Sequence, residues 1–411
     1  MKRLLCLICC LALASMGTTA LASDGDPQRC RPIAEGANDF AFALSRELLA
    51  GDAEGNLVCS PLSVWLPLAA LSNATDPNIR NALLEAICAG GADAADANLA
   101  ASRILADLVD GDAERGNQLR IANAVFVGEG LSLMPDFDRA FRDSYRGTTM
   151  AVDYRSLSAV DAVNAWASEH TDGLIDQIID RFDPQTVVSV ANAIYFSDRW
   201  DWEFNPERTE EGAFDAPTGE IVAEFMLREG SGQRYYEDDE IQAISLPFNS
   251  GGGLLILLPK DAEAGDALGG MTGESFHAIL RDARLREGRL LLPKFEIQGD
   301  TMNLVGELIE LGVPLFDPTA NPLPELIEGN VAVWISDVLH KAIISVDEEG
   351  STAAAVTLAV ARAMGMPPED DPLPPFEMIC DKPFAFVLYG ITRDGGAQVL
   401  FTGVVRNPQA P

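Results

Sequence analysis

Apolar residues recur with helical spacing through the first half of the chain. The helices that this spacing predicts cover residues 38–49, 96–109 and 159–179. A further helix is predicted after Ser60 and Pro61, because serine is a frequent cap and proline a frequent first helical residue. Pro67 lies within this helix and is expected to kink it, because a proline ring clashes with the preceding turn.

Runs of consecutive apolar residues predict strands, mostly in the second half of the chain. Such runs are typical of strands that are buried on both faces. The predicted strands are residues 118–127, 187–196, 253–258, 289–295, 331–339, 341–346, 385–388 and 399–405. Neither an internal repeat nor a linker interrupts this order of helices followed by strands. We therefore expect a single domain of the α+β class with large sheets.

A segment near the C-terminus, residues 348–368, has an unusual alternation. Laid out as a strand, one of its faces carries only small side chains. That face consists of Ser351, Ala353, Ala355, Thr357, Ala359 and Ala361. Small side chains suit a strand that enters a packed sheet, where bulky groups would overpack it. Gly350 provides a hinge, and no proline blocks a backbone ladder before Pro367.

The same segment is also compatible with an alanine-rich surface helix, because alanine has the highest helix propensity. Its β-branched residues, at positions 352, 356, 357 and 360, favour the strand only mildly. The segment by itself therefore leaves the two interpretations open.

The first 22 residues have the pattern of a secretory signal peptide. Lys2 and Arg3 precede an apolar run over residues 4–13, and Ala20-Leu21-Ala22 ends the segment with small residues. The run is too short to span a membrane, and no later run reaches eighteen apolar residues. We therefore expect an exported, extracellular mature protein, residues 23–411, without a membrane segment.

Acidic residues outnumber basic ones by 63 to 29, which gives the chain a formal net charge of −34. A surface this acidic repels nucleic acid and anionic lipid, so neither is an expected partner. Residues 93–110 contain four aspartates and one base, Arg103. That stretch is therefore not expected to bind a polyanion cofactor.

Four cysteines follow the predicted signal peptide, and they allow three disulfide connectivities. They are Cys30, Cys59, Cys88 and Cys380. Cys59 and Cys380 lie in apolar contexts that are typical of core residues, so Cys30–Cys88 is the first pair to test as a disulfide. Asn73-Ala74-Thr75 is a glycosylation sequon, a triplet that is also common by chance.

The sequence lacks the motifs that enzymes of the common classes need. His170, His277 and His340 are far apart, whereas metal sites use ligands at short spacings. No G-x-S-x-G turn supplies a nucleophilic serine. We expect no catalytic residue, no metal and no cofactor. His340 lies between two apolar runs and, on this pattern alone, is expected to be a core histidine.

Motifs spread from about residue 36 to residue 408 resemble the serpin family, and they occur in the family's order. Together they are highly specific. They are Ser60-Pro61-Leu62-Ser63, Asn192-Ala193-Ile194-Tyr195-Phe196 with Trp200, Leu292-Pro293-Lys294-Phe295, Val338-Leu339-His340-Lys341-Ala342, the hinge Glu348-Glu349-Gly350-Ser351-Thr352-Ala353-Ala354-Ala355, Lys382-Pro383-Phe384-Ala385-Phe386 and Phe401-Thr402-Gly403 with Asn407-Pro408.

The resemblance implies a serpin fold with three β-sheets, about eight or nine helices and an exposed reactive-centre loop at about residues 348–373. It also implies a monomer that traps a serine protease covalently when the cleaved loop inserts into the central sheet. The residues that match the family's sheet-opening cluster are Ser60, Ser63, Asn192 and His340. By the same resemblance, Trp200 lies where the loop first enters the sheet.

In the family, the residue on the acyl side of the cleaved bond usually lies sixteen positions after the hinge acid. Counted from Glu348, this gives Met364–Gly365, and methionine suits elastase-, chymotrypsin- or subtilisin-like proteases. The alternative bond, Arg362–Ala363, would suit a trypsin-like protease. A second alternative is a non-inhibitory serpin that acts as a carrier or chaperone. Such a serpin is expected to have bulky, charged or proline residues in its hinge, and residues 350–361 have none.

Overall fold

A computed structural model of the chain forms the basis of the structural description. It describes residues 27–51, 55–110, 118–171, 173–183, 185–329, 331–351 and 373–410. The predicted signal peptide lies outside the described residues, as do the predicted hinge residues Thr352, Ala353, Ala354 and Ala355. Both predicted scissile bonds, Met364–Gly365 and Arg362–Ala363, also lie outside them.

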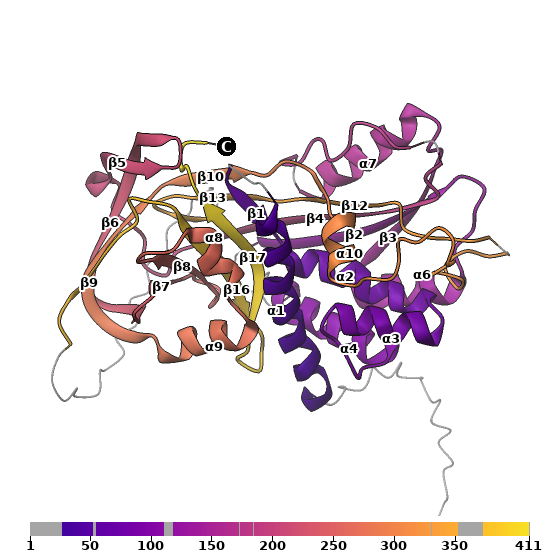
Figure 1. Cartoon of the computed structure of the whole chain (residues 1–411), viewed down its shortest axis with the longest axis horizontal. Helices are drawn as coiled ribbons and strands as arrows, with labels where there is room; N and C mark the ends of the chain where they lie inside the picture. Colours follow the sequence, from indigo (N-terminus) through magenta and orange to yellow (C-terminus); the bar gives the residue numbers. More distant parts are fainter. Residues whose placement is uncertain are drawn as a thin grey trace, which may run out of the picture.

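A six-stranded sheet runs across the middle of the molecule (Figure 1). Its strands, in spatial order, are β11 (Met302–Asn303), β12 (Asp337–Lys341), β4 (Val188–Arg199), β2 (Gln118–Gly128) and β3 (Gly147–Val152), and β14 (Gly350–Ser351) pairs with β4. The strand β4 is buried from Val188 to Ile194, which explains why its sequence is a continuous apolar run. A two-stranded sheet, β10 (Phe295–Gln298) with β13 (Ile343–Val346), adjoins β14.

A nine-stranded sheet forms the other half of the molecule. Its strands, in spatial order, are β1 (Leu57–Cys59), β17 (Ala397–Val405), β16 (Phe384–Ile391), β8 (Gly253–Pro259), β7 (Ile241–Pro247), β6 (Gly219–Glu237), β9 (Arg284–Pro293) and β15 (Phe376–Ile379), with β5 (Glu210–Ala216) on β6. The pairing of β6 with β9 shifts register between Gly230 and Gln233. Such an irregularity increases the local twist, so the 19-residue β6 can pair first with β5 and later with β7.

Helices cover both faces of the six-stranded sheet and the outside of the larger one (Figure 1). They are α1 (Pro27–Ala50), α2 (Pro61–Leu71), α3 (Pro77–Ala86), α4 (Ala94–Leu105), α6 (Pro135–Tyr145), α7 (Leu157–His170), α8 (Ala264–Gly269), α9 (Gly273–Asp282) and α10 (Val305–Glu310). All eleven residues of α2 are buried, and α2 contacts β2, β4 and β17. The helix α7 lies on the opposite face, where Trp166 meets Phe126 edge to face.

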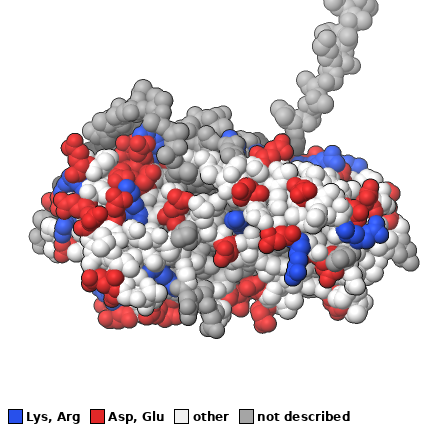
Figure 2. All heavy atoms as spheres, turned by 90° about the horizontal axis from the view of Figure 1, so that it is seen from above, with Lys and Arg blue, Asp and Glu red and all other residues white. Residues whose placement is uncertain are grey.

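The structure confirms the predicted α+β class, with three hydrogen-bonded sheets and nine α-helices within the described part of the chain. Acidic side chains predominate on the face that Figure 2 shows, with lysine and arginine side chains scattered among them. This distribution agrees with the strongly negative net charge. No helix in the described ranges is both long and apolar enough to cross a bilayer.

Several sequence predictions about individual elements are wrong. The helix predicted over residues 159–179 ends at His170, because Thr171 and Asn164 side chains take over the backbone N–H groups of Ile175, Ile178 and Ile179. The strand predicted over residues 331–339 begins only at Asp337. Ser60 precedes α2 as expected, but its hydroxyl makes no cap hydrogen bond and donates to Leu400 O instead.

The predicted disulfide between Cys30 and Cys88 is not formed, and all four cysteines described are free. Cys88 meets α1 at Gly36, six residues or about 9 Å along the helix from Cys30. The sequon at Asn73 is also not presented to solvent. The Asn73 amide pairs with Asn98, and Thr75 is fully buried.

Candidate functional site: the hinge and the seam between β4 and β12

The hinge begins as a short strand inside the six-stranded sheet. Along β4, the parallel strand β12 pairs from Ser189 to Ala193. Further along, β14 takes the place of β12 and pairs antiparallel to β4, with Gly350 opposite Arg199 and Ser351 opposite Asp198. On its other side, β14 contacts β13. The first residues of the predicted reactive-centre loop therefore already lie between β4 of the six-stranded sheet and β13 of the two-stranded sheet.

Gly350 is required where β14 approaches β4. A Cβ atom at this position would clash with the carbonyl oxygen of Asp198 and lie 2.7 Å from Arg199 Cα. The turn before it is closed by Asp347, whose carboxylate accepts hydrogen bonds from the backbone N–H groups of Glu349 (2.9 Å) and Gly350 (3.1 Å). Any other residue in place of Gly350 would push the hinge away from β4.

Trp200 holds the same turn through two hydrogen bonds. Its indole Nε1–H donates to Asp347 O (2.9 Å), and its backbone N–H donates to Glu349 O (3.0 Å). The ring is buried and stacks on Phe248 with ring centroids 4.6 Å apart. The structure thus places Trp200 directly against the hinge.

Glu348 anchors the hinge by its side chain. Its Oε1 accepts a hydrogen bond from Thr209 (2.7 Å) and lies 3.6 Å from Lys294 Nζ. Burial acts to raise the pKa of Glu348, but the Thr209 hydroxyl and the Lys294 charge outweigh it, so the pKa is lowered. The neighbouring Glu349 is half-exposed, and within the described part of the chain its carboxylate forms an ion pair with Arg199 alone, at 3.5 Å. The two adjacent glutamates therefore differ sharply in how firmly they are held.

We expect Glu348→Gln to destabilise the uncleaved protein by roughly 1 kcal/mol, because the charge-assisted contact with Lys294 is lost in a mostly buried setting. The control Glu349→Gln removes a screened surface contact and should change little. Urea unfolding midpoints of both variants measure the difference. Equal midpoints for the two variants would contradict the anchoring role of Glu348.

The four residues of the predicted sheet-opening cluster are all buried and lie where β12 meets β4. His340 and Asn192 are register partners across these two strands. Ser60 donates its backbone N–H to His340 Nε2 (3.0 Å), and Ser63 donates its hydroxyl to Ser60 O (2.8 Å). These bonds attach β12 to the start of α2.

Asn192 is attached to the opposite side. Its Nδ2 donates to Asn123 Oδ1 (2.8 Å) and to Ala122 O (3.1 Å), both on β2. Because His340 Nε2 accepts a hydrogen bond, the proton of its neutral ring is on Nδ1. This Nδ1–H donor and the Asn192 Oδ1 acceptor are both buried, and neither has a partner among the described residues. We call the paired segments Ser189–Ala193 and Asp337–Lys341 the seam between β4 and β12. The seam thus contains two buried polar atoms without a hydrogen-bond partner among the described residues.

Complete burial lowers the pKa of His340 to about 4, because the imidazolium form would lose its hydration. The unfolded chain takes up this proton below pH 6.5, and the folded protein only near pH 4. The free energy of unfolding should therefore fall as the pH decreases through this window, by up to about 1.4 kcal/mol per pH unit from this group.

His340→Gln keeps an acceptor for Ser60 N–H but does not titrate, so its stability should depend less on pH between about 6.5 and 4. Urea unfolding of both proteins from pH 8 to pH 4 tests this expectation. Identical pH profiles, apart from a constant offset, would show that His340 does not titrate in this window.

The far end of the loop is held by a cluster that sequence reasoning missed. Phe376, the first residue of β15, stacks on Tyr235 with ring centroids 4.1 Å apart. It fits because its register partner is Gly288, where a Cβ would clash with the ring. Arg286 lies 5.0 Å over the Tyr235 ring and donates to Pro374 O. A glycine just before a predicted strand was the only signal in the sequence.

Comparison with known proteins assigns the family. A sequence model described as Serpin (serine protease inhibitor) matches residues 35–408. An uncharacterized serpin-like protein of Thermococcus kodakarensis is 30% identical over 386 residues, which cover 92% of this chain and 86% of the relative. Serpin-Z4 of Hordeum vulgare is 30% identical over 87% of this chain and 91% of its own length. The chain belongs to the serpin family.

Solved structures agree with this assignment. The native thermophilic serpin tengpin superposes with a TM-score of 0.80 at 25% identity, over 93% of this chain and 95% of tengpin. Human thyroxine-binding globulin in complex with thyroxine has the same TM-score at 22% identity, over 93% of this chain and all of the other. The fold is the serpin fold. Within the described ranges, no cluster of three or more His, Cys, Asp or Glu side chains could hold a metal ion.

Proposed function

We propose that this chain is an irreversible suicide-substrate inhibitor of serine proteases and has no catalytic activity of its own. The observation that carries the proposal is the position of β14, which starts a new strand between β4 and β13. In the proposed reaction, the protease serine attacks the carbonyl carbon of Met364. The bond to Gly365 breaks, Gly365 leaves as a free amine, and Met364 remains esterified to the protease.

After cleavage, residues 352–364 extend β14 along β4. The extended strand enters between β4 and β12 and separates these two strands. The new strand runs antiparallel to both neighbours, so two antiparallel ladders replace one parallel ladder, which is the less stable kind per residue. Each added backbone hydrogen bond contributes roughly 0.5–1.5 kcal/mol. Insertion carries the attached protease along before water can hydrolyse the ester.

The register of β14 assigns a partner to each inserted residue. Since Ser351 pairs with Asp198, continuation of the same register by six residues along both strands would pair Thr357 with Asn192. His340 lies opposite Asn192 in the present sheet, so the inserted Thr357 would lie between the two. A hydroxyl group both donates and accepts, and it can therefore satisfy His340 Nδ1–H and Asn192 Oδ1 together.

We expect Thr357→Val to raise the fraction of protein that is cleaved without trapping protease, because the inserted strand would leave two buried polar atoms unpaired. The cleaved form should be destabilised by about 1–3 kcal/mol. Thr352→Val makes the same chemical change on the opposite face of the strand and is the matched control. The stoichiometry of inhibition and the urea midpoint of the cleaved protein measure both effects. Equal values for the two variants would contradict the proposed register.

The target class is tested by mixing the mature protein with pancreatic elastase, subtilisin and trypsin. A denaturant-resistant complex and a released peptide that begins at Gly365 are the expected products with elastase or subtilisin. A peptide that begins at Ala363, formed with trypsin, would retain the mechanism and make Arg362 the acyl-side residue. Clean cleavage without a covalent complex would contradict inhibition and favour a non-inhibitory serpin, a carrier or chaperone.

We further propose that the protein is exported and acts as an extracellular monomer. The N-terminal pattern of residues 1–22 supports export. Expression of the full chain in a secreting host should give a mature N-terminus near Ser23, as determined by mass spectrometry. Retention of Met1 on the exported or cell-associated protein would contradict removal of a signal peptide.

A further inference from the structure

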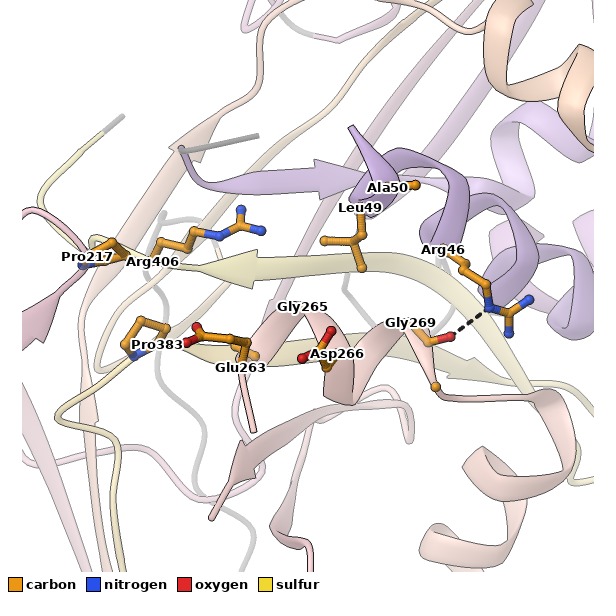
Figure 3. A pocket seen from close by; sticks show the side chains of 12 residues that line it. Arg46, Leu49, Ala50, Pro217, Glu263, Gly265, Asp266, Gly269, Pro383 and Arg406 are labelled. Atoms are coloured by element: carbon orange, nitrogen blue, oxygen red, sulfur yellow. Dashed lines mark hydrogen bonds between the residues drawn. The ribbon is translucent and has the colours of Figure 1, made fainter. Parts of the chain in front are cut away.

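A cavity of about 460 Å³ lies between the C-terminal part of α1, the helix α8 and the strand ends at Pro383 and Arg406 (Figure 3). It shares no residue with the hinge or with the seam between β4 and β12. Its volume is within the range of pockets that hold small organic ligands. Nothing in the proposed inhibitory reaction uses it.

Two glycines of α8 create the open slot in this cavity. A Cβ at Gly265 would lie 3.5 Å from Leu49 Cδ2 and 3.6 Å from Arg406 Nη2, and one at Gly269 would lie 3.8 Å from Leu49 Cδ1. These are ordinary van der Waals distances, so packing does not require glycine at either position. Because glycine has no side chain, the half-buried Leu49 presents its apolar side chain to the slot.

The two arginines of the cavity are held differently. Arg46, at one end of the cavity in Figure 3, donates its Nε–H to Gly269 O (2.8 Å). Arg406, at the other end, donates from Nη1 to Gly55 O and makes no salt bridge with a carboxylate of the described residues. Burial lowers the pKa of Arg406, against the opposing influence of Glu263. A partly buried guanidinium thus has spare donors beside the apolar slot.

We propose that this cavity binds a small amphipathic anion, with an apolar body about the size of two fused aromatic rings and one carboxylate or sulfonate group. The apolar body packs against Leu49 and Ala264 and between Pro217 and Pro383. The anionic group accepts hydrogen bonds from Arg406. Glu263 and Asp266, the two carboxylates that line the cavity, oppose this binding electrostatically.

The charge requirement is tested with 8-anilinonaphthalene-1-sulfonate on the full mature protein, by fluorescence titration and equilibrium dialysis. One saturable site is expected. Arg406→Gln should weaken its binding about tenfold, since a charge-assisted hydrogen bond is lost. Glu263→Gln should strengthen it about twofold to threefold. N-phenyl-1-naphthylamine, which lacks the sulfonate, should bind both variants as it binds the unmodified protein.

The location is tested with Gly265→Ala, which narrows the slot. Alanine is favoured over glycine in a helix, so this variant should fold at least as well as the unmodified protein. It should weaken both probes, whereas the control Gly306→Ala in α10, whose added Cβ meets no atom within 4 Å, should weaken neither. Unchanged binding to Gly265→Ala would overturn the site. Unchanged sulfonate binding to Arg406→Gln would overturn the anion specificity.

Discussion

The parallel pairing of β12 with β4 is the contact on which the rest of this structure depends. It covers five residue pairs, Asp337–Lys341 with Ser189–Ala193. Beyond these pairs, β4 pairs with β14, and the chain that follows β12 forms β13, which pairs with β10. In the fourth pair between β12 and β4, His340 bonds towards α2 and Asn192 bonds towards β2. The polar side chains therefore strengthen the two sides of the seam without joining them across it.

Both faces of the sheet restrain this seam. On one face, the fully buried α2 holds His340 through Ser60, and Ser60 also reaches β17 through Leu400. On the other face, Lys341 donates its Nζ to Gln177 O (3.1 Å) in the segment that follows α7. Because α2 and α7 also contact β4, separation of β4 from β12 affects packing on both faces of the sheet. A seam that has no side-chain hydrogen bond across it among the described residues, yet is held from both faces, is suited to a folded state that persists kinetically.

The sequence was sufficient for the fold class, because the order of helices and strands follows from local patterns and from motifs. The hinge and the sheet-opening cluster stay predictions, and the structure brings the four cluster residues together where β12 meets β4. The sequence was not sufficient for features that depend on long-range contacts. The end of α7 at His170 follows from side chains that bind backbone groups up to 15 residues away. The contact of Arg286 with Tyr235 and Pro374 joins segments 51 to 88 residues apart, and no local pattern encodes it.

In the proposed insertion, the register of β14 would account for the one residue that departs from alanine on the face of the loop segment that carries only small side chains. Beyond Ser351, that face consists of alanines except for Thr357. A uniform requirement for small side chains would be met by alanine at every position. In the proposed insertion, the seam adds a second requirement at one level only, because the register partners His340 and Asn192 each carry a buried polar atom without a partner among the described residues. Threonine would satisfy that requirement at little extra volume, and continuation of the pairing of Ser351 with Asp198 would bring Thr357 to the same level. The proposed insertion would therefore account both for the alanines of this face and for its single threonine.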